Sequence, residues 1–500
     1  MNLDSRGPST PQESRTVPDR PDVVVIIGDC VGVSSIGPTE SSSQNLRFLH
    51  RLSDEGYNFE RAVSTSYWSL PSHASLLTGA YPWDHRVISD NDRLSNELPT
   101  LPEVALGCGY RTAAFSSNPY LSSDFGLSRG FETCSAGDFV ETYLKGWSAR
   151  SFVSHNGRGE VEDSSKSAGR ASQLAPSFIR RNLWALDMGA EFLARLRMSI
   201  TGQDLLVSPW IEGEMTRWLR SVSSSDPVFC VVNLMDAHEP YIGLRPGLDV
   251  PRTRSAVWDA LRLQWPGDAR HRSSHEKLRL EILRELYLAS IEVLDRRAER
   301  LFATFKLARN GREPWLVFVG DHGQSFNGNG DLFHQFGLSD EVFRVPLLIR
   351  PPGGLRRSVR WSDWISIRYL FPILSRVVSG HGISPERDGS PVRGDADPPR
   401  VWALSEMPIS LPDSRGSDGS HHGRGMTLVE FSKQGRVVYG LDGRRVHSSD
   451  EQPRAPITSV DSSDGKSDPE VDRIVTSLRS IEQSISERPV SRRVSSWGYD

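Results

Sequence analysis

The amino-acid sequence predicts an α/β fold in which helices cover both faces of a mostly parallel central sheet, with a small antiparallel subdomain towards the C-terminus. The main observation is a set of hydrophobic runs rich in β-branched residues, at 22–29, 227–236 and 314–323. Uninterrupted runs of this kind are typical of strands buried on both faces. Helical patterns separate the runs along the chain, and strands that alternate with helices form largely parallel sheets.

Further signals complete the main sheet and its helices. Residues 111–118 form a weaker strand pattern. Helical patterns occur at 45–56, 72–79 and 275–311, and the last of these is long, amphipathic and ends in an Asn-Gly pair. Asn and Gly adopt the left-handed conformation that commonly ends a helix, so we expect this helix to stop there.

The C-terminal part has a different pattern. Residues 425–449 alternate between apolar and polar side chains around Gln-Gly and Asp-Gly turns, which predicts an antiparallel meander. A helical pattern at 468–485 closes the chain. We therefore divide the chain into a disordered tail at 1–21, a main α/β domain at 22–380 with an insertion at about 145–205, a loop-rich connection at 381–425, and an antiparallel subdomain with its closing helix at 426–490.

Composition excludes several classes of protein. The chain has 500 residues and a formal net charge of −4, without the basic excess of a general nucleic-acid binder. No run is apolar enough to span a bilayer, and the N-terminal residues lack the apolar segment of a secretory signal. The four cysteines are far apart and form no CxxC pair. We predict a cytoplasmic protein that binds neither nucleic acid nor membrane, and its oligomeric state stays open.

Acidic residues follow the predicted central strands. Asp29, Asp236 and Asp321 stand at strand ends, and histidines follow the last two closely, at His238 and His322. The carboxyl ends of parallel strands share one edge of the sheet, where ligands gather. Buried carboxylates and imidazoles that converge there would repel or be desolvated without a cation. The pattern therefore predicts a divalent metal, with Mg, Ca, Mn and Zn all compatible with these donors.

The stretch YWSLPSHASLLTG, residues 67–79, places Ser69 and His73 where a helix begins. A serine hydroxyl is a poor nucleophile unless a base or a metal activates it. A helix N-terminus presents backbone N–H groups that favour an anion. Such a serine beside a metal suits a sulfate or phosphate ester. The alternative, which the local pattern favours by itself, is that Ser69 or Ser72 merely caps the helix.

Several motifs resemble those of the sulfatase family. SLPSHASLLTG resembles the sulfatase signature, VVVIIGDCVGVSSIG its first strand and metal loop, and VVNLMDAHEPY its substrate-histidine segment. VFVGDHGQSF, followed by LFHQFGLSDEVFRVPLLIRPPG, resembles its second metal loop and the strand after it. These motifs occur in the family's order over residues 22–353. The resemblance implies an alkaline-phosphatase-like α/β sandwich, with 22–380 as the catalytic domain and a small C-terminal subdomain.

The resemblance also implies roles for individual residues. Ser69 takes the position of the nucleophile, and His73 stands where sulfatases have the Arg that supports it. His238 and His334 take positions that contact the substrate or its leaving group. One divalent metal is implied, Ca or Mg ahead of Mn or Zn. Its implied ligands are Asp29, Asp321 and His322.

The sequence departs from the family pattern at three places. Cys30 replaces the second metal-binding Asp, which puts one ligand in doubt. The Lys-Trp-His segment of typical sulfatases is replaced by AAFSSNPYLS, in which Asn118 is either a substrate contact or part of a turn. His73 replaces the Arg that guides conversion of the nucleophile to formylglycine.

The predicted function is metal-dependent hydrolysis of a small-molecule or glycan sulfate ester, by double displacement through residue 69. One alternative is a phosphoesterase or phosphotransferase of the same superfamily that uses unmodified Ser69. A second alternative is an inactive homologue that binds an anionic glycan, for which Cys30 and the missing Lys-Trp-His segment speak.

Overall fold

The computed structural model describes twelve parts of the chain: residues 20–36, 46–136, 207–239, 241, 276–326, 332–334, 339–381, 400–411, 421–432, 435–440, 445–448 and 469–487. The predicted insertion at about 145–205 lies outside the described residues, as does the predicted tail up to residue 19. Among the described helices, none is long and apolar enough to cross a membrane.

A central sheet of eight strands organises the described part of the chain, in the order β10-β2-β9-β6-β1-β5-β3-β4. Strand β1 pairs in parallel with β5 on one side and β6 on the other. Only β9 runs against its neighbours β2 and β6, so the sheet is mostly parallel, as predicted. The strands are β1 Val23–Gly28, β2 Tyr57–Val63, β3 Arg111–Ser116, β4 Thr133–Ala136, β5 Val228–Leu234, β6 Trp315–Gly320, β9 Leu347–Arg350 and β10 Val359–Ser366.

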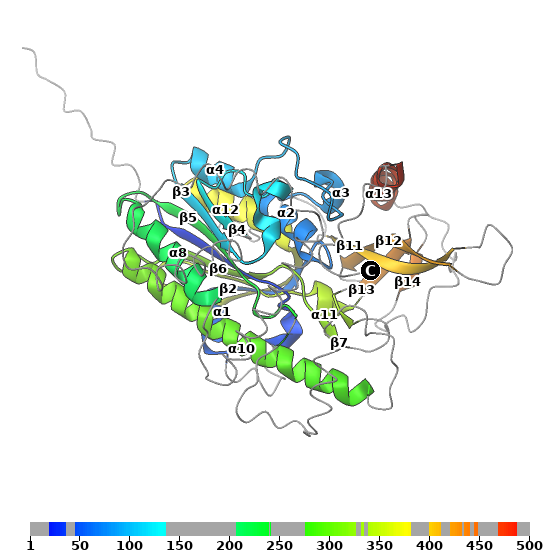
Figure 1. Cartoon of the computed structure of the whole chain (residues 1–500), viewed down its shortest axis with the longest axis horizontal. Coiled ribbons are helices and arrows are strands. Elements are labelled where there is room, and N and C mark those ends of the chain that lie inside the picture. Colours follow the sequence, from blue (N-terminus) through cyan, green and yellow to red (C-terminus); the bar gives the residue numbers. More distant parts are fainter. Residues whose placement is uncertain are drawn as a thin grey trace, which may run out of the picture.

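Helices cover both faces of this sheet (Figure 1). One face packs against α1 Arg47–Asp54, α8 Val207–Ser221 and α10 Glu276–Ala308. The opposite face packs against α2 Ser69–Thr78, α4 Leu101–Gly107 and α12 Leu370–Val378. Strand side chains point alternately to the two faces, which explains why both cores draw on the same strands.

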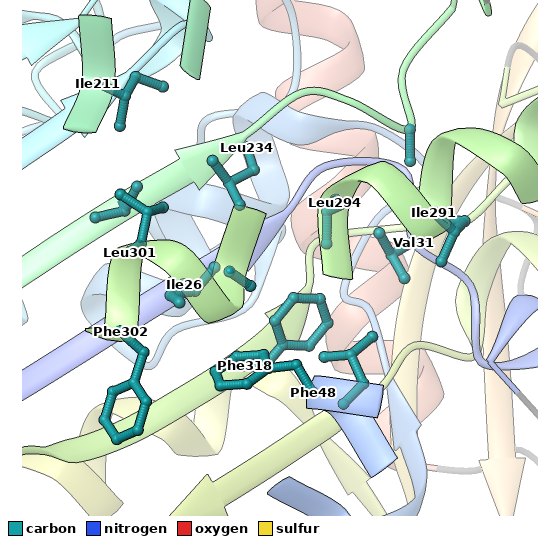
Figure 2. Packing of buried hydrophobic residues seen from close by; sticks show 14 of the residues in the cluster. Ile26, Val31, Phe48, Ile211, Leu234, Ile291, Leu294, Leu301, Phe302 and Phe318 are labelled. Atoms are coloured by element: carbon teal, nitrogen blue, oxygen red, sulfur yellow. The ribbon is translucent and has the colours of Figure 1, made fainter. Parts of the chain in front are cut away.

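Strand β1 shows this alternation directly. Val24 and Ile26 belong to the core under α10, whereas Val25 and Ile27 belong to the core under α2. Figure 2 shows Ile26 and Phe318 of the sheet packed beneath Leu294, Leu301 and Phe302 of α10, with Ile211 of α8 beside them. An unbroken apolar run is therefore required at β1, as the sequence pattern indicated.

Helix α10 ends as predicted. Asn310 and Gly311 have φ angles of 54° and 83°, in the left-handed region. The N–H of Gly311 donates to the carbonyl of Lys306 at 2.7 Å, which satisfies a carbonyl at the helix end. The remaining short elements of the main domain are η1 Val33–Ser35, α3 Pro82–His85, η3 Pro119–Leu121, η4 Ser123–Phe125, β7 Ser325–Phe326, β8 Leu332–Phe333, α11 Asp340–Phe343 and η6 Ile367–Tyr369.

A second, antiparallel sheet confirms the predicted C-terminal meander. It has the order β11-β12-β13-β14, and α13 follows it. The elements are β11 Val401–Leu411, β12 His421–Ser432, β13 Gly435–Gly440, β14 Arg445–Ser448 and α13 Pro469–Glu487. The predicted loop-rich connection at 381–425 contains β11 and the start of β12, which the sequence pattern did not predict. The apolar run at the start of β11 is short, and the strand forms because it pairs with β12 over its whole length.

The small sheet attaches next to the segment that leads into α2. The N–H of Leu404 in β11 donates to the carbonyl of Thr65 at 2.9 Å. Leu404 also packs with Tyr81 and Trp83 and with residues of α13 in one apolar cluster. The C-terminal sheet therefore supports the loop from which Ser69 emerges.

Candidate active site

Ser69 is the first residue of helix α2. The residue before it, Trp68, is extended and makes no side-chain capping bond. Ser72 Oγ lies 2.9 Å from Ser64 Oγ and donates to the carbonyl of Ser66 at 3.3 Å. The helix begins earlier than the predicted residue 72, because Pro71 is tolerated in a first turn. Neither serine caps the helix, so the interpretation of Ser69 as a simple cap was wrong.

Sheet register brings the two metal loops together. Gly28 of β1 pairs with Gly320 of β6, so that Asp29 and Asp321 follow at the same edge of the sheet. Both carboxylates are fully buried. Asp321 Oδ1 accepts hydrogen bonds from the N–H groups of Cys30 at 3.0 Å and His322 at 2.8 Å. The predicted convergence of these residues is what the structure shows.

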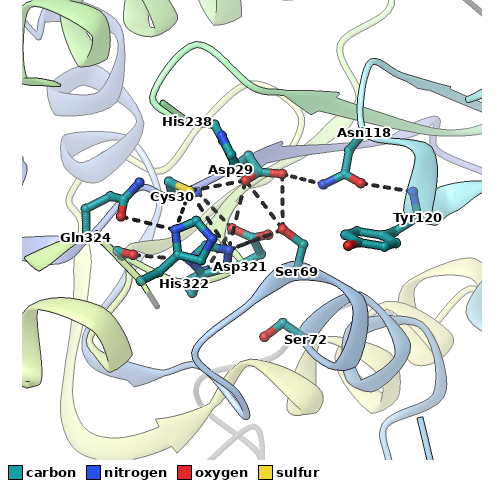
Figure 3. A network of polar contacts seen from close by, with 12 residues as sticks. Asp29, Cys30, Ser69, Ser72, Asn118, Tyr120, His238, Asp321, His322 and Gln324 are labelled. Atoms are coloured by element: carbon teal, nitrogen blue, oxygen red, sulfur yellow. Dashed lines mark hydrogen bonds and ion pairs between the residues drawn. The ribbon is translucent and has the colours of Figure 1, made fainter. Parts of the chain in front are cut away.

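The Nε2 atom of His322 faces the centre of the site (Figure 3). It lies 3.2 Å from Ser69 Oγ, 3.6 Å from Asp321 Oδ2 and 4.0 Å from Asp29 Oδ1. The other ring nitrogen, Nδ1, lies 3.1 Å from the carbonyl oxygen of Gly323 and can only donate to it. That hydrogen bond leaves the lone pair on Nε2, the arrangement that suits a metal-binding histidine.

Asp29 lies between the serine and two amides. Ser69 Oγ is 3.4 Å from each carboxylate oxygen. Asn118 donates to Asp29 Oδ2 at 2.7 Å, and Asn233 donates to the same oxygen at 3.3 Å. Asn118 Oδ1 accepts from the N–H of Tyr120 at 2.9 Å. Asn118 thus orients Asp29 and caps η3, while its contact with substrate stays a prediction.

His73 points at Asp321. Its Nε2 atom lies 3.1 Å from Asp321 Oδ2, and both side chains are fully buried. The contact is an ion-pair contact, and among the described residues Asp321 Oδ2 and both ring nitrogens of His73 are buried without a hydrogen bond of regular geometry. Burial opposes ionisation of Asp321, but His322 and His73 outweigh it and hold the pKa of the carboxyl well below its usual range.

These residues fit a divalent cation. Ligand atoms of Asp29, His73 and Asp321 lie within 4.8 Å of one another, as do those of Asp29, Cys30 and His322. In the described part of the chain, Asp29 and Asp321 pair only with histidines and not with Lys or Arg. A cation would bind the otherwise unbonded Asp321 oxygen and offset two buried negative charges. The predicted ligands come together, and His73 joins them from the helix.

His238 and His334 lie beside this group. Their ring centroids are 5.2 Å apart, and the ring of His334 is 4.6 Å from that of His322. Burial lowers the pKa of His334 to about 3, so its ring is neutral at physiological pH. The structure therefore unites both predicted histidines with the metal loops, although their roles towards a substrate stay predictions.

Cys30 lies between the proposed metal ligands Asp29 and His322 and the side chain of His334. Its Sγ atom lies 3.4 Å from Asp29 Oδ1, 3.8 Å from His334 Nδ1 and 3.9 Å from His322 Nε2. Its φ angle is 62°, a left-handed conformation that is uncommon for a residue with a side chain. Burial, reinforced by the charge of Asp29, raises the pKa of the thiol well above its usual value. Tyr287 Oη supports the loop by donating to the Cys30 carbonyl at 2.8 Å.

Sequence reasoning missed two site residues. Glu239 Oε2 lies 3.9 Å from His334 Nδ1 and accepts from Gln324 Nε2 at 2.6 Å. Glu239 lies one position after His238, and Gln324 lies two positions after His322. This closeness to the motif histidines was the available signal. Asp236, in contrast, forms an ion pair with Arg297 of α10. Its place at a strand end therefore reflects a structural ion pair.

Known proteins resemble this chain in sequence. A family model described as Sulfatase matches residues 21–378. The uncharacterized sulfatase YidJ of Escherichia coli K12 is 21% identical over 361 residues, 68% of this chain and 64% of that protein, just under two thirds of its length. An arylsulfatase of Clostridium perfringens is 23% identical over 384 residues, 71% of this chain and 74% of that protein.

The solved structures confirm the predicted fold class. The phosphonate monoester hydrolase SpPMH from Silicibacter pomeroyi superposes with a TM-score of 0.55 at 16% identity, covering 95% of this chain and 97% of that one. At this identity the likeness concerns the fold alone. That fold is the alkaline-phosphatase-like sandwich with its small antiparallel sheet.

Proposed function

This chain belongs to the sulfatase family, and from that premise we propose that it is a metal-dependent hydrolase of small-molecule or glycan sulfate esters. The observation that carries the proposal is the position of the Ser69 hydroxyl. It stands at the start of α2, 3.4 Å from both oxygens of Asp29 and 3.2 Å from His322 Nε2. A nucleophile placed among metal ligands at a helix N-terminus suits attack on an anionic ester.

The residues around Ser69 could activate its hydroxyl, a weak nucleophile, by holding a cation beside it. Asp29, Asp321 and His322 would hold the cation, with His73 as a further donor. Bound there, a divalent cation would lower the pKa of the serine hydroxyl and offset charge on the transferring group. Asn118 and Asn233 keep Asp29 oriented through hydrogen bonds of 2.7 and 3.3 Å. The backbone N–H groups at the start of α2 would face the oxygens of the sulfuryl group.

The proposed reaction has two displacements. Ser69 Oγ forms a bond to sulfur as the bond from sulfur to the ester oxygen breaks, and overall the serine proton replaces sulfur on the leaving oxygen. Water then attacks the sulfated serine, releases sulfate and restores the hydroxyl. His238 and His334 lie near Cys30 and would assist the departure of the leaving oxygen.

A phosphate ester is the second candidate substrate. The observation that favours it is His73, which stands where sulfatases have Arg and lies 3.1 Å from Asp321 Oδ2. An unmodified serine, which this departure favours, forms a phosphoserine intermediate by the same displacement. The third reading, a protein that binds an anionic glycan without turnover, rests on Cys30 in place of an Asp ligand.

The deciding experiment compares matched aryl esters. The full chain is stripped of metal, reloaded with Ca, Mg, Mn or Zn, and assayed on nitrophenyl sulfate and nitrophenyl phosphate. We expect metal-dependent turnover with sulfate preferred, none with Ser69→Ala, and full activity in the exposed-site control Ser95→Ala. A preference for phosphate would replace the sulfate proposal. No turnover of either ester, with retained binding of a sulfated glycan, would favour the inactive homologue.

A further inference from the structure

We propose that the active site holds a second divalent cation, of the zinc class, beside the one bound by the two aspartates. Its ligands would be the side chains of Cys30, His238, Glu239 and His334. These side chains are buried or nearly so, and their ligand atoms all lie within 4.8 Å of one another. Only the catalytic role of this cation rests on the proposed function, because its binding is measured without turnover.

The separations between the donor atoms are close to those around a tetrahedral zinc ion. Zinc bonds of about 2.0 to 2.3 Å place neighbouring ligand atoms roughly 3.3 to 3.7 Å apart. The Sγ atom of Cys30 is 3.8 Å from His334 Nδ1, and that nitrogen is 3.9 Å from Glu239 Oε2. Contraction by a few tenths of an ångström would therefore bring these three atoms to binding distance of one cation.

The surrounding hydrogen bonds orient the donors. His238 Nδ1 lies 2.7 Å from the backbone carbonyl of Glu239 and must donate to it, which leaves the lone pair on Nε2. Gln324 Nε2 donates to Glu239 Oε2 at 2.6 Å and orients that carboxylate, whereas Gln324 Oε1 lies 3.2 Å from His334 Nδ1, a contact that this nitrogen would give up on binding a cation. Metal-binding side chains are commonly held by outer partners of this kind.

The donor types distinguish this site from its neighbour. Thiolate and imidazole are soft or intermediate donors that favour Zn over Ca or Mg, whereas the two aspartates form a harder site. Cys30 contacts both sites, because its backbone N–H donates to Asp321 Oδ1 while its thiol faces His334. Its left-handed φ of 62° is a conformation that persists only where the surroundings hold it, and it directs this side chain into the cluster.

The buried negative charge in this region also supports a second cation. Asp29 and Asp321 are fully buried, and Glu239 is 9% exposed, so three carboxylates share one region of low solvent access. One divalent cation balances the two aspartates alone. A second would balance Glu239 and a Cys30 thiolate. Held by His238 and His334, it would lie next to the proposed leaving oxygen and supply the assistance that was assigned to these histidines.

The test is a metal titration of the full chain after removal of metal, with Co²⁺ and Zn²⁺ as probes. We expect two equivalents to bind, and the cobalt form to show a thiolate-to-cobalt charge-transfer band in the near ultraviolet. Cys30→Ser should lose the band and one equivalent, and His334→Ala should lose one equivalent. Asp321→Asn should lose the other equivalent but keep the band. The matched controls Cys108→Ser and His50→Ala, which lie outside the site, should bind two equivalents.

A single equivalent in the wild-type protein, with or without the band, overturns the second cation. So does retention of two equivalents by both Cys30→Ser and His334→Ala. Should His334→Ala fail to fold by circular dichroism, Glu239→Gln, which preserves size, serves in its place and should also lose one equivalent. Two bound cations without turnover would contradict the proposed function alone, whereas full turnover with one cation would contradict this inference alone.

Discussion

The hydroxyl oxygen of Ser69 and the Nε2 atom of His322 lie 3.2 Å apart, although 253 residues separate them in the chain. The contact joins the start of helix α2 to the loop after strand β6. It places the proposed nucleophile against a proposed metal ligand.

Ser69 should act as an unmodified hydroxyl. His73 stands where the resemblance implies that the modifying machinery reads Arg, so Ser69 should escape conversion to formylglycine. Mass spectrometry of the 62–86 peptide from the native host should show an intact serine. Ser69→Ala should be inactive with an unchanged melting temperature, whereas Ser72→Ala, which loses the 2.9 Å contact with Ser64, should be active but less stable. An aldehyde or its hydrate at residue 69 would show the prediction wrong.

Removal of metal should abolish turnover and lower thermal stability. A cation that binds only the folded chain stabilises it, by about 2.7 kcal/mol at a concentration a hundredfold above Kd. Asp321→Asn should bind less metal in the titration, and chelator should lower its melting temperature by less than it lowers that of the wild type, because the variant removes charge beside His73. Asp124→Asn, at an exposed position, is the matched control and should behave as wild type. Full activity in a demonstrably metal-free sample would contradict the prediction.

His238 and His334 should matter most for poor leaving groups. Assistance to the leaving oxygen is typically worth about 100 to 10,000-fold, and nitrophenol needs little of it. His238→Ala and His334→Ala should therefore lose rate of that order on an alkyl ester and little on a nitrophenyl ester, as measured by kcat/KM. His50→Ala, exposed on α1, is the control. The histidines are structural if both variants keep full rate on the alkyl ester.

His85 should make stability fall in acid, independently of the active site. Burial lowers the pKa of this histidine to about 3, and its ring nitrogens bond to Ser75 Oγ at 3.0 Å and the Val87 N–H at 3.1 Å. In the unfolded chain His85 takes up a proton near pH 6.5, whereas in the folded chain it does so only near pH 3. The contribution of the neutral His85 to the free energy of unfolding is therefore complete above pH 6.5 and falls as the pH drops towards 3.

The expected slope is about 1.4 kcal/mol of unfolding free energy per pH unit within that window. Urea unfolding at several pH values should show a flatter profile for His85→Gln than for wild type. His50→Gln should leave the profile unchanged. An unchanged slope in His85→Gln would mean that the buried ring does not resist protonation.

Sequence patterns predicted the central strands β1, β5 and β6, the neighbouring strand β3, and most of the site's residues. Unbroken apolar runs identified β1, β5 and β6 because a strand covered on both faces must be apolar along its length. The acidic residues after β1 and β6 then had to share an edge. Ser69, Asp29, Asp321 and His322 could be named for this reason, together with the motif resemblance.

Tertiary structure alone decided how the members meet. Cys30 and His334 are 304 residues apart in the chain, and no local pattern reveals that their side chains approach to 3.8 Å. Asp236 has the same strand-end pattern as Asp29 yet pairs with Arg297, because α10 passes over it. Strand β11 likewise forms only because β12 lies beside it. Sequence periodicity reports which faces are buried, whereas the partner that buries each face is set by packing between distant segments.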